Sequence, residues 1–129
     1  MLRKLALLLV ILMVVVFFPR SAEREEPKIT IREWVVADSK AYAQDVVLAW
    51  ADNQYLCLEK LWAKESNWRP EAYNKVKVMG KNAGGIPQIL GMSVDVPAPK
   101  QIDRGFKYIM HRYGTPCTAW RFHQKRGWY

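Results

Sequence analysis

The sequence predicts a mainly helical single domain with a small irregular or β excursion, preceded by an N-terminal signal peptide or signal anchor. Three observations lead to this fold class. Apolar residues recur at helical spacing in two separate stretches, 53–67 and 100–113. A segment with alternating valines followed by glycine and asparagine lies between them, at residues 75–83. The chain has 129 residues, so one domain is the default expectation.

The N-terminus has the layout of a secretory signal peptide over residues 1–22. Arg3 and Lys4 precede an unbroken apolar run of 14 residues, which is shorter than the roughly 20 that a membrane-spanning helix needs. A cut after Ala22 would place Arg20 where a small residue is usual, so an uncleaved signal anchor is the alternative. Either segment would export the rest of the chain, and membrane contact is expected only there.

A tether or arm is expected over residues 23–37, before a domain that covers residues 38–129. The start of this segment is small and charged. Residues 29–36 contain β-branched side chains without a helical stripe, which indicates a short strand or an extended arm.

Each expected helix of the domain has a start or stop signal. Asp38 or Ser39 can cap the first helix, and Asp52 with Asn53 ends it and caps the second. A glycine terminates the third helix, and Thr115 followed by a first-turn proline begins the last. The expected helices cover about residues 38–50, 53–67, 100–113 and 115–127, with a hairpin or loop at 75–83 and an irregular stretch at 91–99.

Cys57 and Cys117 are the two cysteines of the chain. An even pair in an oxidising compartment indicates a disulfide, and two buried free thiols are the alternative. Closing so long a loop is worth roughly 4 kcal/mol in the chain-entropy description. A metal site is not expected, because neither cysteine has ligand spacing around it. The two histidines, His111 and His123, are expected at the surface without a functional role.

One carboxylate lies on the apolar face of the expected second helix. Four residues, at i, i+3, i+4 and i+7, share this stripe: Leu58, Leu61, Trp62 and Glu65. Burial and the negative end of the helix dipole both raise the pKa of such a carboxyl group. A carboxylic acid that stays protonated near neutral pH suits general acid catalysis on a glycosidic oxygen. A surface glutamate paired with a lysine or arginine is the alternative.

Three blocks of the sequence resemble a known family. Glu65-Ser66 ends a helix, Gly85-Ile86-Pro87-Gln88 follows, and residues 113–120 read YGTPCTAW before a terminal Gly-Trp-Tyr at 127–129. In this order and spacing they resemble the lytic transglycosylase-like, or lysozyme-like, domain of Gram-positive bacteria and their phages. The resemblance covers about residues 53–129. It implies a lysozyme-like fold, peptidoglycan glycan strands as the partner, and no cofactor or metal; a monomer is expected.

The resemblance also implies a reaction in which Glu65 is the single catalytic residue. Glu65 would protonate the oxygen of the β-1,4 bond between N-acetylmuramic acid and N-acetylglucosamine. It would then take a proton from the sugar's own hydroxyl, which closes a 1,6-anhydro ring. A hydrolytic muramidase of the same fold is one alternative, with Asp95 as the candidate second acid. A wall-binding or envelope protein without turnover is the other.

Further residues in these blocks are expected to bind the glycan. Gln88 offers a donor and an acceptor to sugar hydroxyl and acetamido groups, and glycines allow close backbone approach. Aromatic faces stack on sugar rings. The expected substrate-binding residues are Gln88, Ser66, Tyr73, Asn74, Gly85, Ile86, Trp120 and Tyr129. A plain tight turn is the alternative for the glycine-rich block, and a helix C-cap is the alternative for Ser66.

The expected exported part of the chain is basic. The whole chain carries a net charge of +8, and Arg3, Lys4 and Arg20 supply three of these charges, which leaves +5. Such a charge suits an anionic bacterial wall, although ordinary solubility explains it equally well. Nucleic acid is a poor partner, because the protein is expected outside the cytoplasm and has no run of five basic residues.

Overall fold

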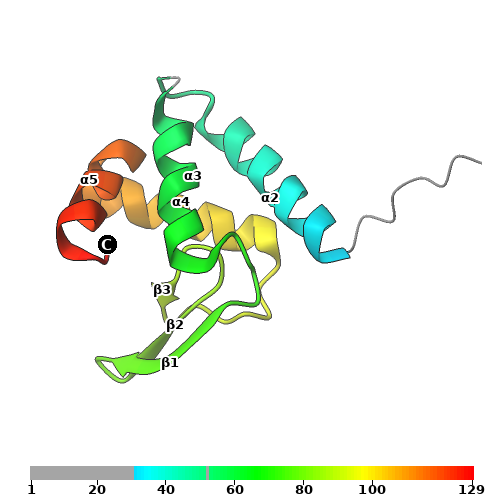
Figure 1. Cartoon of the computed structure of the whole chain (residues 1–129), viewed down its shortest axis with the longest axis vertical. Coiled ribbons are helices and arrows are strands. Elements are labelled where there is room, and N and C mark those ends of the chain that lie inside the picture. Colours follow the sequence, from blue (N-terminus) through cyan, green and yellow to red (C-terminus); the bar gives the residue numbers. More distant parts are fainter. Residues whose placement is uncertain (1–30, 52) are drawn as a thin grey trace, which may run out of the picture.

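The structure, a computed structural model, describes residues 31–51 and 53–129 (Figure 1). Its elements in chain order are α2 (Ile31–Val47), α3 (Asn53–Ser66), β1 (Tyr73–Val78), β2 (Lys81–Gly84), β3 (Ile89–Leu90), α4 (Ala98–Tyr113) and α5 (Pro116–Arg126). The expected mainly helical class with a small β excursion is confirmed. The expected signal peptide or anchor at 1–22 and Asp52 lie outside the described residues.

The first described helix begins earlier than the sequence indicates. Helix α2 starts at Ile31, so the strand or extended arm expected over residues 29–36 is wrong for the part that is described. Ser39, Ala43 and Val47 are buried at i, i+4 and i+8, which shows that one side of α2 packs against the rest of the domain. β-Branched residues disfavour a helix by only tenths of a kcal/mol, so this packing decides the conformation.

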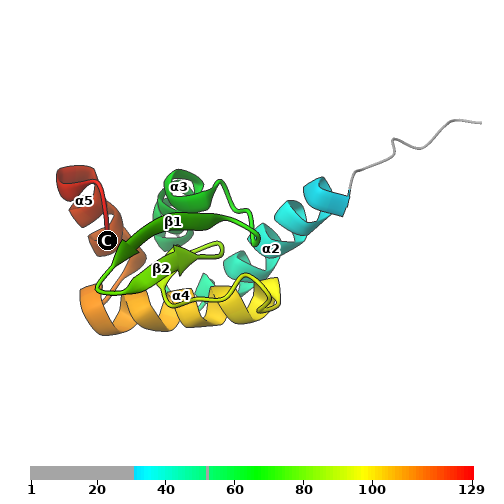
Figure 2. The ribbon, with the colours of Figure 1, turned by 90° about the horizontal axis from the view of Figure 1, so that it is seen from below.

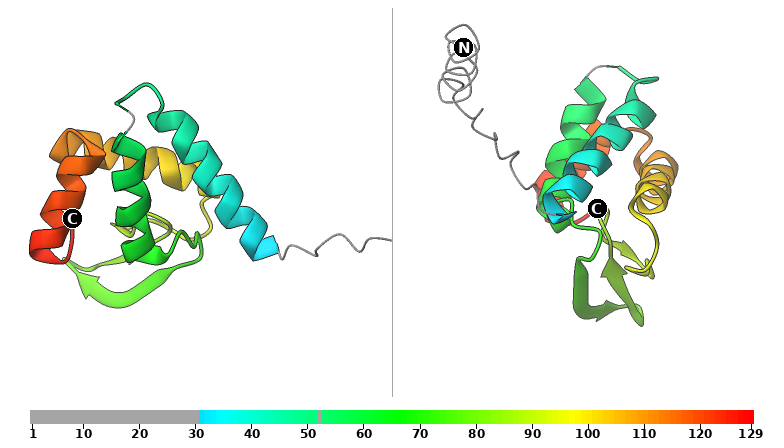
Figure 3. Two further views of the ribbon diagram at one scale, coloured as in Figure 1. Left: turned by 45° about the horizontal axis from the view of Figure 1, so that its top comes forward. Right: turned by 90° about the vertical axis from the view of Figure 1, so that its right-hand side faces the viewer.

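Helix α3 is the centre of the arrangement. Helices α5 and α2 lie on opposite sides of it, and α4 contacts both of these flanking helices (Figures 1 and 3). The sheet lies at the C-terminal end of α3 (Figures 1 and 2). The largest fully buried apolar side chains come from α3, α4 and the loops beside them: Leu58, Leu61, Trp62, Trp68, Ile86, Ile102 and Ile109. None of the described helices combines the length and apolarity required to cross a membrane.

The sheet contains a hairpin, which is one of the two structures expected over residues 75–83. Strands β1 and β2 pair antiparallel, with Tyr73 opposite Gly84 and Val78 opposite Lys81, and β3 adds to the other edge of β2. Met79 and Gly80 form the two-residue turn with φ values of 52° and 76°. Positive φ at both turn residues matches the right-handed twist of the paired strands. The hairpin projects away from the helices (Figure 1).

The predicted ends of the last two helices are confirmed. Gly114 follows α4 with φ 78°, and its N–H donates to the carbonyl of Ile109. The Thr115 hydroxyl accepts a hydrogen bond from the N–H of Thr118 at the start of α5. Gly127 ends α5 in the left-handed conformation. These local signals do not depend on tertiary contacts, which explains why the sequence locates them well.

The predicted disulfide between Cys57 and Cys117 is confirmed. It joins α3 to α5 across a sequence separation of 60, with the two Cα atoms 4.9 Å apart. The N–H of Cys117 also donates to the side chain of Gln54, one turn before Cys57. The disulfide therefore fixes the relative position of the two helices on which the candidate site depends.

Candidate active site

Glu65 lies in the last turn of α3, with its side chain 17% exposed. Burial raises the pKa of this carboxyl group from 4.5 to about 7. The direction and the cause are those predicted from the apolar stripe of α3, of which Leu58, Leu61 and Trp62 are fully buried. Near pH 7, a substantial fraction of Glu65 therefore carries a proton.

His123 of α5 lies directly against Glu65. Its Nε2 atom is 3.0 Å from Oε1 of Glu65, and its side chain is 14% exposed. The expectation that His123 is a surface residue is wrong, whereas His111 is exposed as expected. Helical spacing could have indicated that His123 faces inward. Pro116, Ala119 and His123 fall at i, i+3 and i+7 of α5, and Pro116 and Ala119 are buried.

Two tyrosines complete the surroundings of Glu65. Burial raises the pKa of Tyr113, on α4, and raises that of Tyr129, at the C-terminus, well above its usual value. The charge of Glu65 raises both pKa values further. Both phenols are therefore neutral at physiological pH. The Tyr113 hydroxyl is buried and has no hydrogen-bond partner among the described residues.

The Gly-Ile-Pro-Gln loop is held against the end of α3 that carries Glu65. The Ser66 hydroxyl donates to the carbonyl of Ile86 at 2.7 Å. The Tyr129 hydroxyl accepts from Nε1 of Trp62 at 2.9 Å and donates to the carbonyl of Pro87 at 2.7 Å. Residues of α3, the loop and the C-terminus, which the sequence separates widely, therefore form one connected group.

Gln101 anchors the same loop from α4, and the sequence analysis missed it. This side chain is fully buried; its Oε1 accepts from the N–H of Ile86 at 2.8 Å, and its Nε2 donates to the carbonyls of Pro70 at 3.1 Å and Val96 at 2.8 Å. Gly85 has φ +73°, and a Cβ there would collide with the Gln101 amide. An apolar stripe is defined by apolar residues, so it does not reveal a buried glutamine. Gln101 and Gly105 are four residues apart and both lie on the inner face of α4.

Replacing Gln101 by Leu is expected to lower the free energy of unfolding by at least about 2 kcal/mol, because it leaves the buried N–H of Ile86 and the partly buried carbonyls of Pro70 and Val96 without their partner. Urea unfolding measures the loss. Gln124→Leu, at an exposed position of α5, is the control and should change stability by less than about 0.5 kcal/mol. Equal losses in the two variants would contradict the assigned role of Gln101.

The remaining expected substrate-binding residues differ in their placement. Tyr73 and Asn74 are exposed on β1, while Gly85 and Ile86 are buried. Gln88 is half-buried with φ 52°, and its Nε2 donates to the carbonyls of Ala72 and Gly85. The side-chain NH2 group of Gln88 therefore stabilises its own loop. A tight turn was the alternative interpretation of this block, and these hydrogen bonds agree with it.

Trp120, Ser66 and Tyr129 lie nearer to Glu65. The ring of Trp120 stacks on His123, with centroids 5.6 Å apart and planes 16° apart. Ser66 is buried and Tyr129 is partly buried, and both bond to the loop carbonyls described above.

Asp95, the candidate second acid, lies in the loop between β3 and α4. Asp95 is exposed, and its carboxylate accepts a hydrogen bond from the Ser93 hydroxyl. Among residues 31–51 and 53–129, no group of three or more His, Cys, Asp or Glu side chains is arranged to hold a metal ion.

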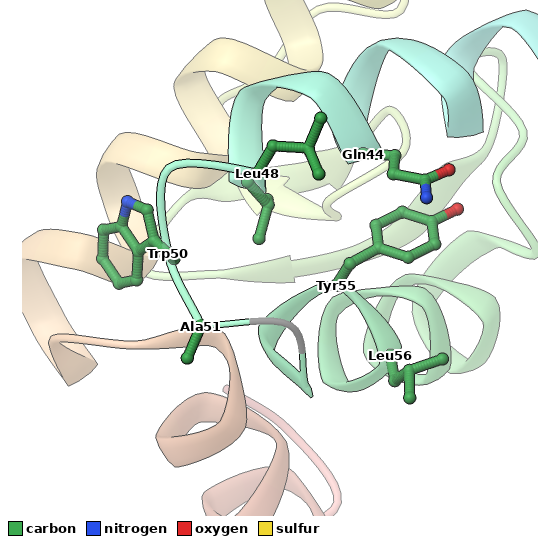
Figure 4. A pocket seen from close by; sticks show the side chains of 7 residues that line it. Gln44, Leu48, Trp50, Ala51, Tyr55 and Leu56 are labelled. Atoms are coloured by element: carbon green, nitrogen blue, oxygen red, sulfur yellow. The ribbon is translucent and has the colours of Figure 1, made fainter.

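A cavity of about 290 Å³ lies elsewhere, between the end of α2 and the start of α3 (Figure 4). Its lining includes Leu48, Trp50 and Tyr55 and contains no acid. The cavity holds no carboxyl group, and burial raises the pKa of its Tyr55 phenol, so Glu65 rather than this cavity is the candidate acid site.

No protein-family model, curated protein or solved structure matches the chain. The resemblance to lytic transglycosylase-like domains therefore rests on its three sequence blocks. Two of these blocks, Glu65-Ser66 and Gly85-Ile86-Pro87-Gln88, are adjacent through the hydrogen bond between Ser66 and Ile86. The third contributes Tyr113, Trp120 and Tyr129 to the same region.

Proposed function

We propose that the protein is a peptidoglycan lytic transglycosylase that cleaves the β-1,4 bond between N-acetylmuramic acid and N-acetylglucosamine. The observation that carries this proposal is the carboxyl group of Glu65, which is 17% exposed and has a pKa raised to about 7. A general acid works best when its pKa lies near the operating pH, because it must be protonated and still give up its proton readily.

The reaction needs one carboxyl group that acts twice. Glu65 gives its proton to the glycosidic oxygen as the bond from C1 of N-acetylmuramic acid to that oxygen breaks. The resulting carboxylate takes the proton of the C6 hydroxyl as O6 bonds to C1. Glu65 regains its proton, the product contains a 1,6-anhydro ring, and no water is consumed.

The placement of the other acids favours this route over hydrolysis. A hydrolytic glycosidase commonly uses a second carboxylate about 5–9.5 Å from the first. Asp95 was the candidate, but it is exposed and engaged in a turn with Ser93. The side chains described around Glu65 are Tyr113, Tyr129 and His123, none of which is a carboxylate.

The rest of the chain suits a substrate outside the cytoplasm. A disulfide joins α3 and α5, as in proteins of oxidising compartments. The net charge of +5 that remains without Arg3, Lys4 and Arg20 favours association with an anionic wall polymer. The exposed aromatic Tyr73 and polar Asn74 on β1 offer a surface for a glycan strand. We therefore propose peptidoglycan strands as the partner and an exported location.

The mass of the products tests the proposal. Digestion of purified cell walls by the full chain is expected to release muropeptides that are one water lighter than hydrolysed ones. Mass spectrometry of the soluble fraction makes the measurement, with a hydrolytic lysozyme as the reference. Products with the full mass would identify a muramidase instead. Binding to walls without any released muropeptide would remove the enzymatic function.

A further inference from the structure

His123 lies between Glu65 and Trp120 and contacts both. Its Nε2 lies 3.0 Å from Oε1 of the carboxyl group. The flat face of its ring stacks on Trp120, three residues earlier in α5, which fixes the plane of the imidazole. Because α3 and α5 are joined by the disulfide, the two helices hold the imidazole and the carboxyl group at a fixed separation.

We propose that His123 is a positioning residue that acts as a neutral hydrogen-bond donor. Its Nε2–H donates to Oε1 of Glu65 and leaves Oε2 to hold the proton that is delivered to the glycosidic oxygen. This inference rests on the proposed function, because it assigns a task to the carboxyl group that this function uses.

The surroundings disfavour a positive charge on His123. Burial lowers the pKa of the imidazole, and the nearby Lys64 lowers it further. Burial also raises the pKa of Glu65, so both members of the pair are stabilised in their neutral forms. A cationic imidazole at 3.0 Å would favour the carboxylate and would remove the proton that the first step requires.

The other titratable groups around the pair come from three parts of the fold. Lys64 precedes the carboxyl group on α3, Tyr113 and its neighbour Tyr108 lie on α4, and Tyr129 lies at the C-terminus. The raised pKa values of Tyr113 and Tyr129 keep these phenols neutral at pH 7. Lys64 is the charged neighbour that lowers the pKa of His123, and it opposes a second positive charge there.

A neutral donor helps both halves of the proposed reaction. It holds the plane of the carboxyl group, so that Oε2 keeps one direction towards the bond that breaks. When the proton leaves, the same N–H faces an ionised carboxylate, and hydrogen bonds to ionised acceptors are stronger than neutral ones. The bond thus stabilises the charge that develops in the reaction, which affects kcat more than KM.

Nuclear magnetic resonance on the full chain without substrate tests the charge state directly. Nitrogen-15 shifts of the His123 ring at pH 7 are expected to show a neutral imidazole protonated at Nε2. Carbon-13 shifts of the Glu65 carboxyl group are expected to give a pKa near 7. A His123 ring that is protonated on both nitrogens at pH 7 would overturn the proposal. This measurement does not depend on turnover.

Two substitutions then distinguish the hydrogen bond that His123 donates from the packing of its ring on Trp120. His123→Gln keeps an N–H at a similar distance, while His123→Phe keeps a ring for Trp120 and removes the donor. With soluble glycan-strand fragments, His123→Phe is expected to lower kcat by about 10–100-fold with KM changed by less than about twofold. Its alkaline pH limit should move upward, because the lost donor favoured the ionised form. His123→Gln should keep the pH limit and most of the rate.

The outcomes distinguish this inference from the proposed function. Equal kcat values and pH limits in wild type, His123→Phe and His123→Gln would leave no positioning role. An upward shift of about one pH unit or more in His123→Gln would show that the wild-type histidine is cationic and would also overturn the inference. Absence of turnover in the wild type would contradict the proposed function, while the resonance experiment would still decide the state of the pair.

Discussion

Glu65→Gln is expected to reduce the release of muropeptides from purified walls by about 10²–10⁴-fold, the usual contribution of general acid–base catalysis. The amide is similar in size to the carboxyl group but can neither give up nor take a proton in the reaction. Binding of the wall should persist, because the substitution removes chemistry rather than surface. Release of soluble muropeptides measures the rate, and co-sedimentation with walls measures binding.

A second glutamate of α3 supplies the matched control for this variant. Glu59 pairs with Lys40 at 3.0 Å and is half-exposed, so Glu59→Gln should keep nearly the full rate and lose at most about 1 kcal/mol of stability. Asp95→Asn should also keep the rate, since the proposed reaction uses no second acid. Equal release by wild type and Glu65→Gln would rule out Glu65 as the acid. Loss of activity in Asp95→Asn alone would point to hydrolysis.

Removal of the disulfide is expected to have the largest effect on stability. The double variant Cys57→Ala/Cys117→Ala should lower the free energy of unfolding by about 4 kcal/mol, because the loop between the cysteines is long and its closure restricts the unfolded chain. Urea unfolding of the variant and the wild type measures the difference. For a domain of this size, such a loss is a large share of the total stability.

The wild type under reducing conditions is the control for the missing disulfide. It should lose about as much stability as the double variant, since both lack the same link. A loss below about 1 kcal/mol in both would show that the contacts between α3 and α5 hold these helices without it. Where the domain remains folded, carbon-13 shifts of Glu65 would report whether its pKa still lies near 7.

The sequence determined those features that depend on neighbouring residues. Gly114, Thr115 and Gly127 mark helix ends through their own backbone and side-chain preferences, and the structure has each of them in that role. Alternation of apolar residues located the hairpin, and helical spacing placed Glu65 on the buried side of α3. The disulfide pairing could also be predicted, because the chain contains only two cysteines.

Sequence reasoning failed where propensity and packing disagree. The β-branched start of α2 was expected to be extended, but the helix begins at Ile31, and Ser39, Ala43 and Val47 farther along it are buried. Gln101 was not expected in the interior, because polar residues usually remain in water. Its burial is tolerated because all three of its hydrogen bonds are made to loop backbone.

Only the tertiary structure decided what surrounds the acid. Tyr129 bonds to Trp62 across 67 residues and to Pro87 across 42, and His123 reaches Glu65 from another helix. Periodicity assigns a residue to the inner face of its own helix, but it does not determine which side chain of another helix it meets. That depends on how α3 and α5 pack together. The sequence therefore identified the carboxyl group, and the fold supplied its partners.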